Sequence, residues 1–384
     1  MARDKTNMAL RASICIVIFL AACTQPPPEP SSKTAAPQST ATIQQTALAA
    51  AATSGVTATS TPPKSPAVTA TLPVTPLPTP LPTNSPPRAA EFSPTPDPYV
   101  LLSVEALAKR EYGGGKLEIL QTVEANDHFS RYLITYPSDD LSVAGFMNVP
   151  NEGSKFPVAI VLHGYVPPAE YETLAYTQRY ADTLAEAGYI VIHPNLRGYP
   201  PSDDGPDPFR IGMAADVLNL IAIIRQQSQD PLGPLRRADA NDINLWGHSM
   251  GGGVALRVIT VNNDEYLKTA VLYGAMSGDE VLNYGRIQQW SGGLRGDFEL
   301  NASPETLNAI SPINHLERIN AAISVHHSDA DDVVPLAWST DLCRRLEARA
   351  HPHECHIYSG APHTFIGVWD ELFIERTIRF FNQH

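Results

Sequence analysis

The stretch Asn244-Leu-Trp-Gly-His-Ser-Met-Gly-Gly-Gly253 decides the fold of this chain. It contains a G-x-S-x-G pattern centred on Ser249, with an apolar run before it and a helix-compatible run after it. A strand, a sharp turn and a helix are the context of a nucleophile elbow, in which the serine hydroxyl stands clear of the sheet. Such a strained turn tolerates only small neighbours, which explains Gly247 and Gly251. The pattern predicts Ser249 as a nucleophile; a glycine-rich turn that holds a serine by chance is the simpler alternative.

Continuous apolar runs on both sides of this stretch predict strands that are buried on both faces of a sheet. They cover residues 156–162, 189–194, 269–274 and 323–327. Helical patterns accompany them at residues 176–187, 214–227, 336–350 and 369–381. The pattern of 214–227 is amphipathic. This alternation of buried strands and helices implies an α/β fold with a mostly parallel, doubly wound sheet.

The segment before the first buried strand has a different character. Three short runs rich in β-branched and aromatic residues predict antiparallel strands at 117–123, 131–136 and 141–149. Residues 100–112 have helical spacing, and three glycines follow them. Because only about 50 ordered residues precede the buried strands, we expect no propeller-like array of repeats there.

At the Ser249 stretch the chain resembles the α/β-hydrolase superfamily, and it is most similar to the prolyl oligopeptidase and dienelactone hydrolase branches. The resemblance covers about residues 115–384 and rests on four further matches. These are His163-Gly-Tyr165 after a predicted strand, the Arg197-Gly198 loop, the Asp331-Asp-Val-Val-Pro335 turn and a late histidine loop. The resemblance implies an oxyanion hole made of the backbone N–H groups of Met250 and Tyr165. We expect His163 and Arg197 to have structural roles.

The resemblance also implies the two partners of Ser249. Family members carry an acidic residue four positions before the proline of the D-x-V-V-P turn, which is Asp331 here, with Asp329 and Asp332 as competitors. The family places its base in a glycine-containing loop before the last helix, which gives His363. The order Ser249, Asp331, His363 is that of α/β-hydrolases and differs from the two protease orders built on other folds.

These residues predict acyl transfer through a covalent acyl-enzyme, without a metal or an organic cofactor. We expect a small ester as the substrate, because the expected cap insertion, residues 279–310, has many charges and few apolar residues. Turnover should then fall as the acyl chain lengthens. A serine peptidase of the prolyl oligopeptidase type is the alternative, with Asp203 and Asp204 gripping the peptide amine. A catalytically inactive surface-binding module is a further alternative, and the complete set of three residues argues against it.

Cysteine and histidine near the C-terminus raise two questions. His351, His353, Cys355 and His356 could suggest a metal site, but the last two are strand neighbours that point to opposite faces, so we expect no metal. Cys343 and Cys355 lie twelve residues apart, on an expected helix and the strand after it. An oxidising compartment would allow a disulfide between them, and two small buried thiols remain an equal alternative.

The N-terminus has the features of an export signal. Basic residues precede an apolar run at 14–20, which is too short for a transmembrane helix of about 20 apolar residues. Leu20-Ala-Ala-Cys23 resembles the bacterial lipobox, which implies cleavage before Cys23 and a diacylglyceryl group on its sulfur. An ordinary signal peptide that ends at Ala22 is the alternative. We therefore expect a protein of the bacterial cell envelope that is anchored to the membrane through lipid alone.

Three domains follow from composition. Residues 1–23 are the expected signal, 24–98 a Pro-, Thr- and Ala-rich linker, and 99–384 the catalytic domain. The linker is expected to be a disordered tether, with a proline-rich ligand for a partner domain as the alternative. The chain has a net charge of −13, and the part from Tyr99 onward has −15, which argues against nucleic acid as a partner. A small ester or short peptide is the expected partner, and no pattern indicates an oligomeric state.

Overall fold

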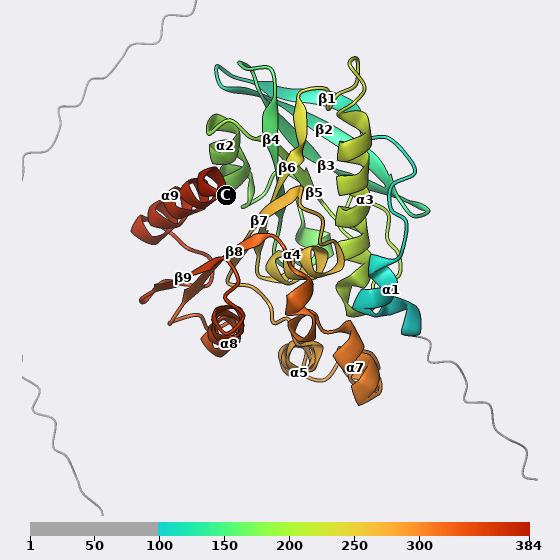
Figure 1. Ribbon diagram of the computed structural model, residues 1–384, viewed down its shortest axis with the longest axis vertical. Coiled ribbons are helices and arrows are strands. Elements are labelled where there is room, and N and C mark those ends of the chain that lie inside the picture. The colour runs from blue at the N-terminus through green and yellow to red at the C-terminus, as the bar shows by residue number, and fades with distance from the viewer. Residues whose placement is uncertain (1–98) are drawn as a thin grey trace, which may run out of the picture. The chain divides into compact units, whose positions relative to one another are not determined.

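The computed structural model describes residues 99–384. They form a nine-stranded sheet with the strand order β1-β2-β3-β5-β4-β6-β7-β8-β9 (Figure 1). The strands are β1 (Glu118–Ala125), β2 (Phe129–Ser138), β3 (Leu141–Pro150), β4 (Phe156–Leu162), β5 (Ile190–Pro194), β6 (Ala238–His248), β7 (Leu267–Tyr273), β8 (Ala322–Ser328) and β9 (His353–Tyr358). The pairs from β1 to β5 are antiparallel, and those from β5 through β4 to β9 are parallel. The predicted mostly parallel sheet with antiparallel strands at its start is confirmed.

Helices cover both faces of the sheet (Figure 1). They are α1 (Val104–Ala108), α2 (Gln178–Glu186), α3 (Ile211–Gln227), α4 (Met250–Val261), α5 (Glu280–Trp290), α6 (Asp297–Leu300), α7 (Pro304–Ile310), α8 (Leu336–Glu347) and α9 (Val368–Gln383). Buried residues of α1, α3, α4 and α8 belong to one apolar core, and those of α2 and α9 to a second core. The sheet separates the two cores, so it is doubly wound, as predicted.

Strand β4 shows why the apolar runs are continuous. Val158, Ile160 and Leu162 lie in the first core, whereas Ala159 and Val161 lie in the second. Successive side chains of a strand point to opposite faces, so a strand with a core on each side needs apolar residues at every position. The central strands therefore carry no alternating pattern.

Two helical predictions need correction. The expected helix 100–112 is instead a short 3-10 turn (Val100–Leu102) followed by α1, because Ser103 interrupts it and caps α1 by accepting a bond from the Ala106 N–H at 3.2 Å. The amphipathic reading of 214–227 is also wrong, because α3 is buried on nearly every side. Its polar residues Asp216, Asn219 and Gln227 are buried, and the Asn219 side chain accepts from the Gly113 N–H at 2.8 Å.

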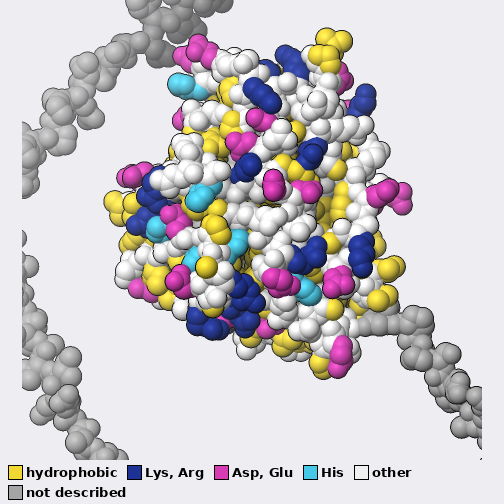
Figure 2. Space-filling model, viewed as in Figure 1, with side chains coloured by type: hydrophobic (Ala, Val, Ile, Leu, Met, Phe, Trp, Pro, Cys, Tyr) yellow, Lys and Arg dark blue, Asp and Glu magenta, His cyan; other side chains and the backbone are white. Residues whose placement is uncertain are grey.

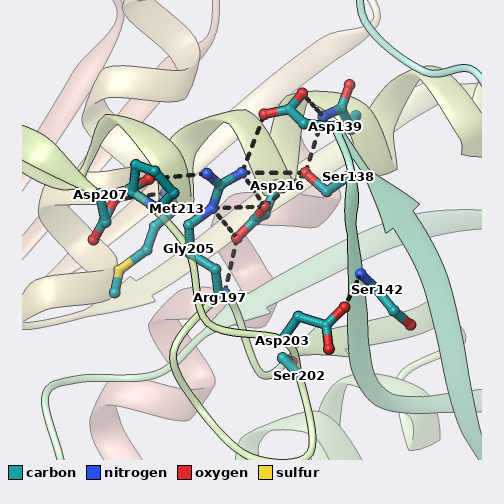
Figure 3. Close-up of polar contacts among 12 residues, drawn as sticks. Ser138, Asp139, Ser142, Arg197, Ser202, Asp203, Gly205, Asp207, Met213 and Asp216 are labelled. Atoms are coloured by element: carbon teal, nitrogen blue, oxygen red, sulfur yellow. Dashed lines mark hydrogen bonds and ion pairs between the residues drawn. The ribbon is translucent and has the colours of Figure 1, made fainter.

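Asp216 of α3 takes part in a buried polar network (Figure 3). Its carboxylate accepts bonds from the Arg197 guanidinium, at 2.7 Å from Nη2, and from the Ser138 hydroxyl at 2.6 Å. Arg197 also donates to the Pro206 carbonyl at 3.0 Å and pairs with Asp139. One guanidinium thus joins α3, the end of β2 and the loop after β5, which is the loop-pinning role expected for Arg197.

The visible face of the described domain mixes acidic and basic side chains over most of its area (Figure 2). None of the helices in the described part of the chain combines the length and the apolar character that crossing a membrane requires. The predicted signal, Cys23 and the linker fall in residues 1–98, outside the described residues.

Candidate active site

Ser249 occupies a strained turn between β6 and α4. Its backbone has φ 54° and ψ −114°, which an L-residue adopts only when its surroundings enforce it. A Cβ on Gly247 would collide with the carbonyl oxygen of Gly251, and one on Gly251 would collide with that of Leu162. The two glycines are therefore required for the close approach of strand and helix, as the sequence predicted. Helix α4 begins at Met250, so its N-terminus adjoins the serine and favours negative charge there.

His363 and Asp331 form a hydrogen-bonded pair at the same edge of the sheet. His363 Nδ1 lies 2.7 Å from Asp331 Oδ2, and the Asp331 side chain is only 1% exposed. A carboxylate only accepts, so the histidine proton is on Nδ1 and Nε2 is left unprotonated in the neutral ring. That tautomer is the one that a general base requires.

Further hydrogen bonds hold the Asp331 carboxylate. Its Oδ1 accepts from the N–H groups of Val333 and Val334 at 2.9 and 2.8 Å, and His327 Nε2 lies 3.3 Å from Oδ2. Burial raises the pKa of this carboxyl, but the bonds from His327 and His363 outweigh burial, and the pKa is well below its usual value. Asp331 is therefore a carboxylate throughout the physiological range.

The two competing aspartates, Asp329 and Asp332, have other hydrogen-bond partners. Asp329 is exposed and accepts bonds from Gly360 N–H at 2.7 Å and from the Ser359 hydroxyl at 2.8 Å, and these bonds lower its pKa. They join the turn after β8 to the loop that leads to His363. Asp332 is exposed, and its backbone carbonyl accepts a bond from Arg286 at 2.9 Å.

The loop after β4 lies against the nucleophile. A Cβ built on Gly164 would be 3.1 Å from the Cβ of Ser249, so only glycine fits there without displacement. His163 is fully buried between two carbonyl oxygens, with Nδ1 2.7 Å from Gly164 O and Nε2 2.8 Å from Asn195 O. Its burial lowers its pKa. The buried ring thus packs between the loop after β4 and the loop after β5, which is the structural role expected for it. The Tyr165 side chain is 53% exposed.

A cavity of about 1520 Å³ contains these groups. Its walls include Ser249, His363, Gly164 and Tyr165. The expected cap region contributes α5, α6 and the turn between them, and it lines the cavity with Ile287, Trp290, Leu294 and Phe298. The cap was expected to have few apolar residues, and these four nevertheless lie on the cavity wall. Charged cap residues, Arg295, Asp297 and Glu299, line the same cavity.

The cap is fastened to the catalytic core by two arginines. Arg257 of α4 pairs with the buried Glu280 of α5 and donates to the Ile310 carbonyl at 2.7 Å. Arg286 of α5 donates to the carbonyls of Asp332 and Val333 at 2.9 and 3.2 Å, in the turn that carries Asp331. The position of the cap is thus coupled to both the nucleophile helix and the acid turn.

The loop that follows β5 contributes both signs of charge to the cavity. Asp203 does not line it, because its carboxylate accepts from the Ser142 N–H at 2.8 Å (Figure 3). Asp203 and Asp204 therefore do not form the amine-gripping pair considered for a peptidase. Asp207 and Arg210 line the cavity. One terminal nitrogen of Arg210, Nη2, is buried without a hydrogen-bond partner among residues 99–384.

The C-terminal cysteines and histidines have separate roles. Cys343 of α8 and Cys355 of β9 are joined by a disulfide, with Cα atoms 6.5 Å apart. On the opposite face of β9, His356 and Glu354 approach His326 of β8, and their ligand atoms lie within 4.8 Å of one another. Both His326 nitrogens already bond, to Ser324 Oγ at 2.7 Å and Tyr358 Oη at 2.8 Å. A metal there would have to displace one of these bonds.

Sequence reasoning missed three residues beside the predicted set. His327 supports Asp331, and Tyr176 and His248 lie directly beside Ser249 on the cavity wall. His248 is the variable residue of the G-x-S-x-G pattern, so its position could have marked it as a neighbour of the nucleophile. Tyr176 had no such signal: the sequence placed it at the start of the helix 176–187, whereas α2 begins at Gln178 and Tyr176 lies in the turn before it.

The fold and this site define a hydrolase of the α/β-hydrolase class. The dienelactone hydrolase family matches residues 143–373, and the chain belongs to that family. This agrees with the branches that the motifs indicated.

Several solved structures have the same fold. Acetyl xylan esterase 1 from Thermoanaerobacterium sp. is 16% identical over 69% of this chain and 88% of its own, with a TM-score of 0.51. An esterase from Pyrococcus furiosus is 16% identical over 70% of this chain and 99% of its own, with a TM-score of 0.51. Acylaminoacyl peptidase from Pyrococcus horikoshii is 20% identical over 71% of this chain but only 50% of its own, with a TM-score of 0.51. At these identities the likeness shows the fold.

Proposed function

We propose that this hydrolase is a serine carboxylesterase with the triad Ser249, His363 and Asp331. The observation that carries the proposal is the 2.7 Å bond between His363 Nδ1 and Asp331 Oδ2, which leaves Nε2 as a base in the cavity that contains Ser249. Ser249 is held in a strained turn of the kind that presents a nucleophile. Esterases that match nearly over their whole length are consistent with it.

The mechanism uses only groups of this chain. His363 takes the proton of Ser249 as its oxygen attacks the ester carbonyl. The N–H groups of Met250 and Tyr165 stabilise the oxyanion, each donating one hydrogen bond. His363 then protonates the leaving alcohol, and a water molecule hydrolyses the acyl-enzyme by the reverse route. Asp331 holds the tautomer and stabilises the imidazolium in both steps.

The cavity favours an ester with a bulky apolar group. Its volume of about 1520 Å³ is larger than a short acyl chain can fill. Trp290, Leu294 and Phe298 are largely exposed side chains on its wall, and Leu294 is 88% exposed. Burying them against substrate would contribute about 25 cal/mol for each Å² removed from water. Arg210 on the cavity wall adds a positive charge for a polar group of the substrate.

The first prediction tests the nucleophile. Ser249→Ala should lower turnover of a nitrophenyl ester by several orders of magnitude, because the acyl-enzyme cannot form. A fluorophosphonate should label the wild type and not the variant. More than a tenth of the wild-type turnover in Ser249→Ala would refute the assignment.

The same assay separates substrate classes. We expect kcat/KM to rise from acetyl to bulky aromatic or medium-chain acyl esters, since only these reach the cap side chains. Aminoacyl and prolyl nitroanilides, measured under the same conditions, should be poorer substrates. A nitroanilide with the higher kcat/KM would support the peptidase alternative.

We also propose that the enzyme is exported and anchored through lipid on Cys23, with residues 24–98 as its tether. The support is the sequence of the first 98 residues alone: a basic segment, a short apolar run, a lipobox-like Leu20-Ala-Ala-Cys23 and a proline-rich stretch. A disulfide in the catalytic domain agrees with an oxidising compartment.

A further inference from the structure

A row of polar groups connects the three loops of the catalytic site. Tyr176 Oη is hydrogen-bonded to the Gly164 N–H in the loop after β4. The same Oη lies 3.2 Å from His248 Nδ1, and His248 Nε2 lies 3.3 Å from the backbone oxygen of His363. Tyr176 and His248 both line the cavity, and none of the roles described above uses them.

The direction of each hydrogen bond follows from what each group can donate. A backbone carbonyl only accepts, so His248 Nε2 carries a proton and donates it to His363 O. Burial and the neighbouring charge of His363 lower the pKa of His248 to about 3, so the ring is neutral and Nδ1 is an acceptor. The single hydroxyl proton of Tyr176 is therefore given to Nδ1. Its oxygen accepts the Gly164 N–H.

This arrangement restricts the oxyanion donors. The Gly164 N–H is used by Tyr176, and the Tyr176 proton is used by His248, so neither can bind an oxyanion. The peptide between Gly164 and Tyr165 is also held from the other side, because its carbonyl oxygen lies 2.7 Å from His163 Nδ1. Gly164 thus has one contact at its N–H, with Tyr176, and one at its carbonyl oxygen, with His163. Together they fix the orientation of the Tyr165 N–H, which is the donor expected for the oxyanion.

We propose that Tyr176 and His248 are positioning residues that align the oxyanion loop with the nucleophile elbow and the base loop through one directed chain of hydrogen bonds. This inference rests on the proposed esterase function and deepens it. Neither residue touches the reacting atoms in this scheme. Their contribution is to hold the Tyr165 N–H and His363 in one relative arrangement, and it should appear where charge develops in the transition state.

The test uses the full-length protein and variants that keep each ring. Tyr176→Phe removes only the hydroxyl, and His248→Phe removes both nitrogens while keeping a ring beside Tyr273 and His363, whose ring centroids lie 4.2 and 4.7 Å away. The double variant Tyr176→Phe, His248→Phe completes a double-mutant cycle. Tyr189→Phe, which loses one tyrosine bond to Asn382 far from the cavity, is the matched control.

Each variant is assayed with a nitrophenyl ester and with a boronic acid, which forms a tetrahedral adduct on the nucleophile. We expect Tyr176→Phe to lower kcat by about 10- to 100-fold with little change in KM, the loss typical of a weakened oxyanion site. The boronate inhibition constant should rise in parallel. The double variant should lose no more than the worse single variant, because either change breaks the same chain.

Two results would overturn the inference. One is a Tyr176→Phe enzyme whose kcat and boronate inhibition constant match those of Tyr189→Phe. The other is a fully additive double variant. If His248→Phe does not fold, Tyr176→Phe decides alone. Ser249→Ala is run in parallel, so that failure of the esterase assignment, seen as an active Ser249→Ala enzyme, is distinguished from failure of the positioning chain.

Discussion

Asp331 shows how much the role proposed for a side chain depends on its surroundings. Three carboxylates occur within four residues of this turn, and their chemical groups are identical. Only Asp331 is buried and accepts bonds from two backbone N–H groups and from His363. The motif spacing selected this residue, and in the structure it lies against His363. The contribution of His327 was not accessible from sequence, because contact between the end of β8 and the turn depends on the path of the chain.

Asp331, the proposed acidic member of the triad, gives the second prediction. Asp331→Asn should lower kcat by about 10⁴-fold, because the amide no longer selects the histidine tautomer with Nε2 free. Asp329→Asn is the matched control in the same turn, and it should keep kcat within about ten-fold, since its carboxylate only supports a surface turn. The measurement is the steady-state kinetics of both variants on the same ester. An inactive Asp329→Asn enzyme beside an active Asp331→Asn enzyme would contradict the assignment.

Asp207 gives a prediction about pH. Burial raises the pKa of its carboxyl to about 7, although the Met213 N–H and Arg210 lower it in part. The folded state therefore binds more protons than the unfolded state between about pH 4 and 7, so this group lowers stability as the pH rises through that window. Asp207→Asn removes the effect. The free energy of unfolding of the variant, relative to wild type, should rise by up to about 4 kcal/mol from pH 4 to pH 8.

The measurement is urea unfolding at a series of pH values. Asp204→Asn serves as the control, because this exposed carboxyl on the same loop is solvated in both states. A difference between Asp207→Asn and wild type that stays constant with pH would show that Asp207 ionises normally in the folded protein.

At the scale of elements, Arg197 decides how α3 and the loop after β5 are joined to the sheet. The Asp216 side chain that it pairs with is 0% exposed, so its charge has no access to water. Arg197→Ala should lower the free energy of unfolding by about 3–5 kcal/mol, because it leaves a buried carboxylate without a partner.

Arg344→Ala is the control for that measurement. It removes the pair with Asp341 on the surface of α8, where both side chains are well exposed, and it should cost at most about 1 kcal/mol. Equal losses in the two variants would mean that the buried network contributes no more than a surface pair.

The elements also show where sequence reasoning succeeds and fails. The central strands were predicted because a sheet with a core on each face requires unbroken apolar runs, as in β4. Residues 100–112 were misread because helical spacing persists across Ser103, although its side chain ends one turn and caps the next. The apolar side of the cap was missed for a related reason. Its side chains come from α5, α6 and the turn between them, so no single helix has a strong apolar face.

For the whole molecule, the family, the fold and the order of the three catalytic candidates followed from motifs. The proposed substrate preference did not, because the cavity is assembled from several separate segments, and its volume depends on how they pack. The expectation for short acyl groups used composition alone. Composition counts side chains but does not give the direction in which they point.

The export hypothesis gives the last prediction. Cys23→Ser should prevent incorporation of a labelled lipid precursor and move the protein from the membrane fraction to the soluble fraction, because lipid chains on Cys23 are its expected anchor. Ester hydrolysis by the released protein should be unchanged. A Cys23→Ser protein that stays in the membrane fraction would identify the uncleaved apolar run at 14–20 as the anchor.

The disulfide between α8 and β9 has a consequence for where this protein can work. The chain from α8 to the end of β9 connects the turn of Asp331 to the loop of His363, and the Cys343–Cys355 bond closes that connection on itself. In a thiol-rich cytoplasm this ring would stay open, and α8 and β9 would then be joined by packing and by the chain between them. Heterologous production in a reducing host would then yield a domain that lacks this cross-link.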